Sequence, residues 1–436
     1  MAKNVIKKDR TTTVDVTEPD SQWIIGKTVS LTGDPAFRAQ DVDGITVDVR
    51  GKILTEAESI LIYSVGDGET SDDATVTIAK SGRVNATHHG IFVEGNAFTL
   101  DNAGIINSAE GFGVHVIGDG VDIDNTGKIL SGADHAIRLD DTMFFQLTNS
   151  GVISTKGNTA AIEGTGLTMG SITNEAGGKI GVISFAEDSG AISIVNKGSI
   201  AAGVGALHEG IGFGDSNDSL VNRGKIGGDV YFGDGNDTGD FRKGTATDIF
   251  ILGGDGNDTF IIDDAATRIY EFSGGGADVI QTTVSFTLGN LISDRVETLV
   301  AIGKKKVDLT GNDQENSIYG NDKSNHLLGG GGDDMLSGKG GNDLMDGGAG
   351  EDHFVFGENS GVDTIEGFVL GLDMILLNLI PGIDNFGDLD GRITNSDKGD
   401  FAIVDLGDGN RIRLSGIDAG DLKSTDFSII GDIVLP

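Results

Sequence analysis

Short runs of apolar residues alternate with polar ones along the chain and recur at intervals of slightly more than twenty residues. In the first half, the motif Asn-x-Gly-x-Ile or a close variant begins at Asn102, Asn125, Asn149, Asn174, Asn196 and Asn222. Short strands separated by Gly/Asn turns at this period predict a parallel β-helix, because each coil buries the face that its neighbour leaves open. The repeated Asn is predicted to form an amide ladder inside one corner of the coils.

One strand of four successive coils can be aligned by its aliphatic residues. If these point inward, strand alternation sends the residue between them outward. The row predicted to face outward is Phe92, His115, Arg138 and Glu163. Such a row could engage a polysaccharide or be an ordinary solvated face, and the second interpretation is favoured because any outward row must contain polar residues.

A second period, of nine residues, begins at Gly311. Five blocks follow one another without a gap: GNDQENSIY, GNDKSNHLL, GGGGDDMLS, GKGGNDLMD and GGAGEDHFV. Each has Gly first, Asn or Asp sixth and an apolar residue eighth, which predicts a six-residue turn followed by a three-residue strand. Two blocks form one coil, so turns eighteen residues apart share an edge. One edge would carry Asn316, Asp334 and Asp352, and the other Asn325 and Asp343.

Related turns precede these blocks at a longer step. GDSND, GDGND, GGDGND and GGGAD end at Asp218, Asp237, Asp258 and Asp278, at steps of 19, 21 and 20 residues. A step of about one coil predicts a transition region in which only one edge of each coil carries such a turn.

The Gly and Asp residues of these turns indicate that they bind a metal ion. Gly permits positive φ and lets backbone carbonyls converge, while Asp supplies anionic oxygen. Carbonyl and carboxylate oxygens are the ligands that Ca²⁺ prefers, so several calcium ions are predicted. The predicted ligands are Asp218, Asp237, Gly254, Asp255, Gly256, Asp258, Gly275, Asp278, Gly330, Gly332, Asp334, Gly341, Asp343, Gly348, Gly350 and Asp352. Weaker or missing sites are expected where Asn316 and Asn325 replace Asp.

The charge and residue usage exclude several classes of protein. With 31 Lys+Arg against 68 Asp+Glu, the chain of 436 residues has a formal net charge of −37 and would repel nucleic acids. It has no Cys, hence no disulfide and no thiolate site. Neither a cleavable signal peptide nor a membrane-spanning apolar run is visible. The common protease, hydrolase and phosphate-loop signatures are also missing, so no catalytic residue is assigned.

The nonapeptides resemble the RTX (repeats-in-toxin, haemolysin-type calcium-binding) family over about residues 214–357. Segments 362–368 and 405–414 resemble the C-terminal domain of serralysin-type proteins, although the protease domain and its zinc motif are missing and proteolysis does not carry over. The resemblance implies type I secretion with an uncleaved C-terminal signal. The Asn-x-Gly-x-Ile coils resemble both β-helical adhesins and polysaccharide lyases.

We therefore expect an all-β chain in which a parallel β-helix continues into a calcium-binding β-roll with a C-terminal β cap. The expected parts are an arm or cap (1–40), the β-helix (41–213), transition coils (214–304), the roll (305–357) and a secretion and capping domain (358–436). The expected function is that of a secreted, non-enzymatic calcium protein at the bacterial surface or matrix, such as an adhesin or surface-layer component. The alternative is a polysaccharide lyase or epimerase. Expected partners are the type I secretion machinery and either a surface polysaccharide or further copies of the chain.

Overall fold

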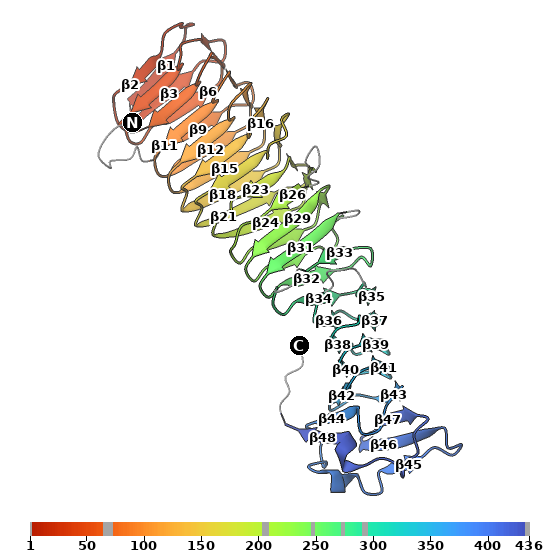
Figure 1. Cartoon of the computed structure of the whole chain (residues 1–436). Helices are drawn as coiled ribbons and strands as arrows, with labels where there is room; N and C mark the ends of the chain where they lie inside the picture. Colours follow the sequence, from red (N-terminus) through yellow and green to blue (C-terminus); the bar gives the residue numbers. More distant parts are fainter. Residues whose placement is uncertain are drawn as a thin grey trace. The chain divides into compact units, whose positions relative to one another are not determined.

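The computed structural model describes residues 2–63, 73–202, 209–245, 249–271, 275–289 and 295–431. These residues form a nearly all-β, parallel β-solenoid of about 15 turns (Figure 1). Within the described part there is no α-helix, only two 3-10 helices. The chain divides into two compact units, one of residues 1–254 with 267–269 and the other of residues 255–266 with 270–436. The predicted fold class is therefore confirmed.

The first unit has three faces, each built from one strand per coil. Sheet A contains β1 (Ala2–Ile6), β3 (Ser21–Ile25), β6 (Thr46–Val49), β9 (Thr75–Ile78), β12 (Phe98–Asn102), β15 (Val121–Asn125), β18 (Phe144–Asn149), β21 (Met169–Asn174), β24 (Ala191–Asn196), β27 (Ser219–Asn222) and β30 (Thr238–Asp240). Sheet B contains β4 (Ser30–Leu31), β7 (Lys52–Leu54), β10 (Arg83–Ala86), β13 (Ile105–Ser108), β16 (Lys128–Ser131), β19 (Val152–Thr155), β22 (Lys179–Ile180), β25 (Ser199–Ile200) and β28 (Lys225–Ile226). Sheet C contains β2 (Val14–Val16), β5 (Phe37–Gln40), β8 (Ile60–Tyr63), β11 (Ile91–Glu94), β14 (Val114–Ile117), β17 (Ile137–Asp140), β20 (Ile162–Thr165), β23 (Ile183–Phe185), β26 (Glu209–Gly212), β29 (Asp229–Asp234), β31 (Phe250–Asp255) and β33 (Arg268–Tyr270).

The core of this unit consists of inward rows of aliphatic side chains that stack from coil to coil. In sheet A, Leu100, Ile123, Leu147 and Ile172 pair in register and are almost completely buried. Their strand neighbours point outward, as the alternation of a half-buried strand requires. Each coil thus completes the core of the next one. This explains why a repeat sequence without long apolar runs still forms a folded core.

A buried ladder of asparagine amides closes one corner of the coils. From Asn102 to Asn196, each side-chain Nδ2 donates to the Oδ1 of the Asn one coil later, at 2.7 to 2.9 Å. The ladder runs through Asn102, Asn125, Asn149, Asn174, Asn196 and Asn222. All six side chains are buried, so this pairing satisfies polar groups that water does not reach. The predicted amide ladder is confirmed.

Asn149→Ala should loosen the coils on both sides of the ladder. The change removes the acceptor of Asn125 Nδ2 and the donor to Asn174 Oδ1, two buried hydrogen bonds whose loss costs about 2–4 kcal/mol. Hydrogen–deuterium exchange should show faster exchange in β15 and β21. Asn158→Ala, at an exposed position, serves as the control. Equal protection in the two variants would contradict a structural role for the ladder.

The second unit contains two parallel stacks. Sheet D contains β32 (Thr259–Ile262), β34 (Val279–Thr282), β36 (Thr298–Ala301), β38 (Ser317–Tyr319), β40 (Met335–Ser337), β42 (His353–Phe356), β44 (Met374–Asn378) and β48 (Phe427–Ile430). Sheet E contains β35 (Phe286–Thr287), β37 (Leu309–Thr310), β39 (His326–Gly331), β41 (Leu344–Ala349), β43 (Val362–Glu366), β47 (Asn410–Ser415), β46 (Phe401–Gly407) and β45 (Ile393–Asn395). From β38 to β42, successive nonapeptides alternate between the two stacks, so two blocks form one coil as predicted.

The two ends of the chain differ in how they continue the coils. Residues 2–40, expected as an arm or cap, form β1–β5, which pair in parallel with the following strands. At the other end the chain becomes antiparallel, since β46 pairs with both β45 and β47. The 3-10 helices η1 (Phe386–Leu389) and η2 (Ser424–Asp426) lie in the same region. No helix within the described residues is long and apolar enough to cross a membrane.

Candidate calcium centres

The sixth residues of the turns form a ladder along the edge of sheet D. The backbone N–H of Asn316 donates to Asp334 Oδ1 at 2.8 Å, and that of Asp334 to Asp352 Oδ1 at 2.9 Å. The N–H of Asp352 then donates to Asp373 Oδ1 at 3.1 Å. Each of these carboxylates lies against the turn of the preceding coil, as the predicted stacking of turns eighteen residues apart requires.

The edge of sheet E carries an equivalent ladder. The backbone N–H of Asn325 donates to Asp343 Oδ1 at 2.7 Å, and that of Asp343 to Asp363 Oδ1 at 2.8 Å. All three side chains are buried. The two predicted edges of the roll are therefore present, each with buried carboxylates between stacked turns.

In Asp334 and Asp343 one carboxylate oxygen serves the ladder and the other is left available, whereas both oxygens of Asp373 accept backbone N–H groups. Asp334 Oδ2 and Asp343 Oδ2 are buried and have no hydrogen-bond partner among the described residues. Burial raises the pKa of both carboxyls to about 7, and that of Asp363 to about 8. A negatively charged oxygen that is buried in a turn without water destabilises the fold unless a cation lies close to it.

Glycine makes room for that oxygen and brings backbone carbonyls close to it. A Cβ at Gly338, the first residue of its block, would lie 2.0 Å from Asp343 Oδ2. A Cβ at Gly348 would lie 2.1 Å from the carbonyl oxygen of Gly330 in the coil below. The predicted glycines with a positive φ include Gly254, Gly256, Gly330, Gly332, Gly341, Gly348 and Gly350. Converging carbonyls beside a spare carboxylate oxygen form an all-oxygen donor set that suits Ca²⁺.

The acids that end the earlier turns, Asp218, Asp237, Asp258 and Asp278, each directly precede a strand, namely β27, β30, β32 and β34. In the first unit, the N–H of Asp218 donates to Asp237 Oδ1 at 2.6 Å. Asp218 Oδ2 is buried without a hydrogen-bond partner in the described part of the chain, and burial raises the pKa of this carboxyl to about 7. Asp255, also a predicted ligand, is exposed at the end of β31.

A buried cluster of three acids lies in the second unit. Carboxylate oxygens of Asp258, Glu271 and Asp278 all lie within 4.8 Å of one another. Burial raises the pKa of Asp278 to about 7, and the charges of Asp258 and Glu297 act in the same direction. Asp278 Oδ1 accepts from the N–H of Asp258 at 2.8 Å, so this cluster also belongs to a ladder. Three buried carboxylates so close together fit a hard divalent cation.

Asparagine at the sixth place changes the chemistry of the leading turns. Asn316 Nδ2 donates to the carbonyl of Val296 at 3.0 Å, and Asn325 Nδ2 to that of Val307 at 2.6 Å. In these two turns an amide N–H therefore faces a carbonyl oxygen, whereas the Asp turns offer a carboxylate oxygen instead. A donor in this position takes up an acceptor that a cation would need, which supports the expectation of weaker sites there.

Four acidic residues of these ladders escaped the sequence analysis. Glu297 accepts from the N–H of Asp278 at 2.7 Å, while Asp363 and Asp373 continue the two edges beyond the last nonapeptide. Glu271 completes the buried cluster. Asp363 and Asp373 follow Asp343 and Asp352 by 20 and 21 residues, the one-coil step already visible upstream. That step could have revealed both of them, whereas nothing in the local sequence distinguishes Glu271.

The row predicted to face outward forms on sheet C, where Phe92, His115, Arg138 and Glu163 pair in register. Its side chains are packed rather than free, since His115 is only 9% exposed and the other three are half-buried. The Phe92 and His115 rings meet edge to face at 5.1 Å.

Ion pairs join this row to its neighbours. Arg138 Nη1 lies 2.9 Å from Glu163 Oε1, and Arg138 Nε lies 2.7 Å from Asp140 Oδ1. Asp140 Oδ2 is 2.8 Å from His115 Nε2, and His135 pairs with Glu163. Burial lowers the pKa of His115 and outweighs the opposing effect of Asp140. The single guanidinium of the row is therefore neutralised by two carboxylates.

Comparison with known families bears on the roll. Residues 310–345, 319–354 and 328–365 match the family described as RTX calcium-binding nonapeptide repeat (4 copies). Residues 310–365 are RTX repeats. These repeats bind calcium and are present in several copies. Proteins that carry RTX repeats are exported by type I secretion, so the repeats indicate a secreted calcium-binding protein.

The sequence resemblance to RTX repeats was expected over about residues 214–357, but the family match begins at residue 310 and does not include the turns at residues 218–278. Those turns recur about once per coil and not every nine residues. The comparison with curated proteins gives no match. Among solved structures, the chain is similar to the extracellular lipase LipA from Serratia marcescens, with 17% sequence identity and a TM-score of 0.20. That similarity covers 55% of this chain and 40% of the lipase chain.

Asp334→Asn should weaken calcium binding at least tenfold at its site. The variant keeps an oxygen that can accept from the N–H of Asn316 but replaces the spare anionic oxygen with an NH₂ group, which only donates hydrogen bonds and cannot ligate a cation. Asp333→Asn is the matched control, because Asp333 is the exposed neighbour and the same charge is removed. Isothermal titration calorimetry should show fewer strong sites in the first variant alone. If the two variants bind calcium equally, Asp334 is not a ligand.

Proposed function

We propose that this chain is a secreted, non-enzymatic calcium-binding RTX protein that folds on calcium outside the cell. It acts at the bacterial surface or in the extracellular matrix as an adhesin, a biofilm component or a surface-layer component. The observation that carries this proposal is the pair of buried carboxylate ladders whose spare oxygens face glycine turns. Such a device is useful where calcium is scarce inside the producing cell and plentiful outside it.

The residues proposed to hold calcium are the buried acids at the sixth place and the carbonyls of the glycine turns around them. In the roll these acids are Asp334, Asp343 and Asp352, with Asp363 and Asp373 added by the structure. When bound, calcium supplies positive charge between stacked turns. The chain's own contribution is the rigid stack, which holds each carboxylate in place through a backbone N–H.

The alternative, a polysaccharide lyase or epimerase, would need a free cation to hold a uronate carboxylate. Arg138 is the guanidinium of the predicted outward row, and Asp140 and Glu163 already hold it from two sides. His115, its neighbour in the same row, is buried against aromatic rings. An anionic sugar would have to displace both acids in an already acidic chain, so we favour the non-enzymatic proposal.

Export is tested by deletion of residues 405–436. This segment includes β47, which pairs with β43, and β48, which pairs with β44. If the C-terminal domain carries the secretion signal, the truncated chain should stay in the producing cell, with at least a tenfold loss from the medium measured by quantitative immunoblot. Equal amounts of truncated and full-length protein in the medium would refute the proposal.

A fusion separates export from folding. Residues 358–436 attached to a cytosolic passenger protein should appear in the medium when a type I transporter is co-expressed. Full-length chain expressed with a transporter that cannot hydrolyse ATP is the matched control, since it should stay inside. A passenger that is retained under conditions that export the full-length chain would place the signal elsewhere.

A further inference from the structure

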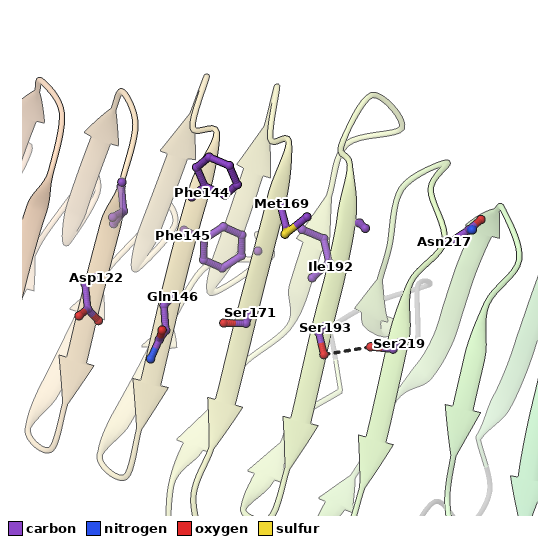
Figure 2. Close-up of a pocket in the computed structure, with 14 residues that line it drawn as sticks. Asp122, Phe144, Phe145, Gln146, Met169, Ser171, Ile192, Ser193, Asn217 and Ser219 are labelled. Carbon is purple, nitrogen blue, oxygen red and sulfur yellow. Dashed lines mark hydrogen bonds between the residues drawn. The ribbon is translucent and has the colours of Figure 1, made fainter.

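A groove of about 530 Å³ lies on the outer face of sheet A, far along the chain from the RTX repeats (Figure 2). It crosses β15, β18, β21, β24 and β27. One border is apolar, with Phe144 and Met169 paired in register and 54% and 52% exposed. The other border is polar, with Gln146, Ser171 and Ser193 in register on successive coils. This volume is in the range of small-molecule and oligomer sites.

The floor of the groove is preformed. Phe145 is 5% exposed, and its ring lies over Gly170 of the next coil. A Cβ at Gly170 would lie only 1.8 Å from that ring, so the missing side chain leaves the space that Phe145 fills. Phe145 and Gly170 lie on the buried side of their strands, and the Phe145 ring also lies 6.0 Å from that of Phe185 in sheet C, so this packing holds the strands beneath the groove in place.

The charge of the groove points to an uncharged ligand. The chain carries a formal net charge of −37, yet among the described residues that line the groove Asp122 is the only one that ionises. With no cation in that lining, a polyanion would gain nothing there and would meet the field of the whole chain. Hydroxyl and amide groups, by contrast, can both donate and accept hydrogen bonds.

The spacing of the groove points to a polymer. Polar side chains recur once per coil, and neighbouring parallel strands lie about 4.8 Å apart, close to the length of one sugar residue in an extended glycan. The exposed ring of Phe144 offers an apolar face to the C–H groups of a sugar, and exposed apolar side chains gathered at one place mark binding surfaces. We propose that this groove binds a neutral polysaccharide chain laid along the stacking direction of the coils.

This partner rests on the proposed extracellular function, since such a polymer would be met outside the cell. The other occupant to consider is a second copy of the chain. Two copies of net charge −37 repel each other, and a ladder of single hydroxyls is better suited to a repeating ligand than to an irregular protein surface. A second copy is therefore treated as an outcome of the test.

The test is affinity electrophoresis of the full chain in calcium, with folding verified by circular dichroism. The native gels contain hydroxyethyl cellulose, galactomannan, dextran or soluble starch, and an alginate gel provides the anionic comparison. At least one neutral polymer should retard the chain, and alginate should not. The double variant Phe144→Ala with Met169→Ala should bind about tenfold more weakly, because it removes the aromatic ring and the apolar border of the groove. Leu54→Ala, which removes an exposed apolar residue of sheet B, should bind like the unmodified chain.

Three results would overturn the proposal: no retardation by any neutral polymer, equal binding by the double variant, or preference for alginate. A dimer in sedimentation velocity that the double variant abolishes would assign the groove to a second copy instead. The calcium-dependent circular dichroism signal is recorded in the same samples. A folded, calcium-responsive chain that binds no polymer would end the groove proposal while leaving the proposed function intact.

Discussion

Removal of calcium should unfold the RTX roll of the second unit while leaving the coils of the first unit largely folded. In the roll, Asp334 lies beside the charges of Asp352 and Asp333, and its spare oxygen has no partner in the described structure. Without a cation, the stacked turns either bury negatively charged carboxylates close to one another or keep these carboxylates protonated, and both states destabilise the roll at neutral pH. The first unit depends instead on aliphatic rows and the asparagine ladder, which need no ion.

The size of the effect follows from linkage. Each ion that binds only the folded roll stabilises it by about 2.7 kcal/mol when free calcium is one hundred times the dissociation constant. Three such sites would contribute about 8 kcal/mol, comparable with the entire stability of an ordinary domain. Chelation should therefore lower the melting temperature of the roll by tens of degrees, or abolish its transition at room temperature.

Hydrogen–deuterium exchange with and without chelator locates the change. Protection should be lost in β38–β43 and kept in β12–β24. Magnesium at the same concentration is the matched ionic control, because it requires a tighter octahedral shell and should not restore protection. An unchanged circular dichroism spectrum and unchanged melting after chelation would show that the roll folds without calcium.

The sequence predicted those parts of the structure that depend on local register. Asn149 and Asp343 each occupy a place that recurs in every coil, at intervals of 22 to 26 residues in the Asn coils and 18 residues along one edge of the roll. Stacking then brings equivalent residues together whatever the intervening side chains are. For this reason the amide ladder and the two edges of the roll could be predicted from spacing alone.

Features that depend on several coils at once were not predictable in this way. Arg138 was expected to point outward, but whether it is free depends on Asp140 along its own strand and Glu163 in the next coil. The groove of sheet A likewise needs Phe144, Gly170 and Ser193 from three coils. Coil lengths in this region vary by several residues, so spacing does not reveal which outward side chains become neighbours.

The stability of the roll should change with pH in opposite directions with and without calcium. Burial raises the pKa of Asp334 and Asp343 to about 7 and that of Asp363, at the end of the roll, to about 8, against about 4 in the unfolded chain. Between pH 4 and 7 the folded roll therefore holds more protons than the unfolded one. The free energy of unfolding then falls as the pH rises, and the stabilisation present below pH 4 is lost above about pH 7.

With saturating calcium the sign should reverse. Calcium binds the ionised carboxylates, so protons compete with it below about pH 7 and the roll should become more stable as the pH rises. Melting temperatures of the roll, measured at pH 5.0 and 7.5 with and without calcium, test whether the sign reverses. The calcium-free series uses stripped buffer rather than a chelator, because acid also protonates chelators. The expected result is a higher melting temperature at pH 5.0 without calcium and at pH 7.5 with it.

The double variant Asp334→Asn with Asp343→Asn tests whether these carboxyls cause the reversal. Asn does not titrate, so the pH dependence of the calcium-free roll should become flatter, and the gain from calcium at pH 7.5 should shrink. Asp333→Asn removes an exposed carboxylate from the same turn and should change both slopes much less than the double variant, because burial is the largest cause of the raised pKa of Asp334 and the charge of Asp333 is a smaller one. If the unmodified roll gains stability with pH in both series, its ladder carboxyls are ionised in the calcium-free fold, and a counter-charge other than calcium must hold the turns together.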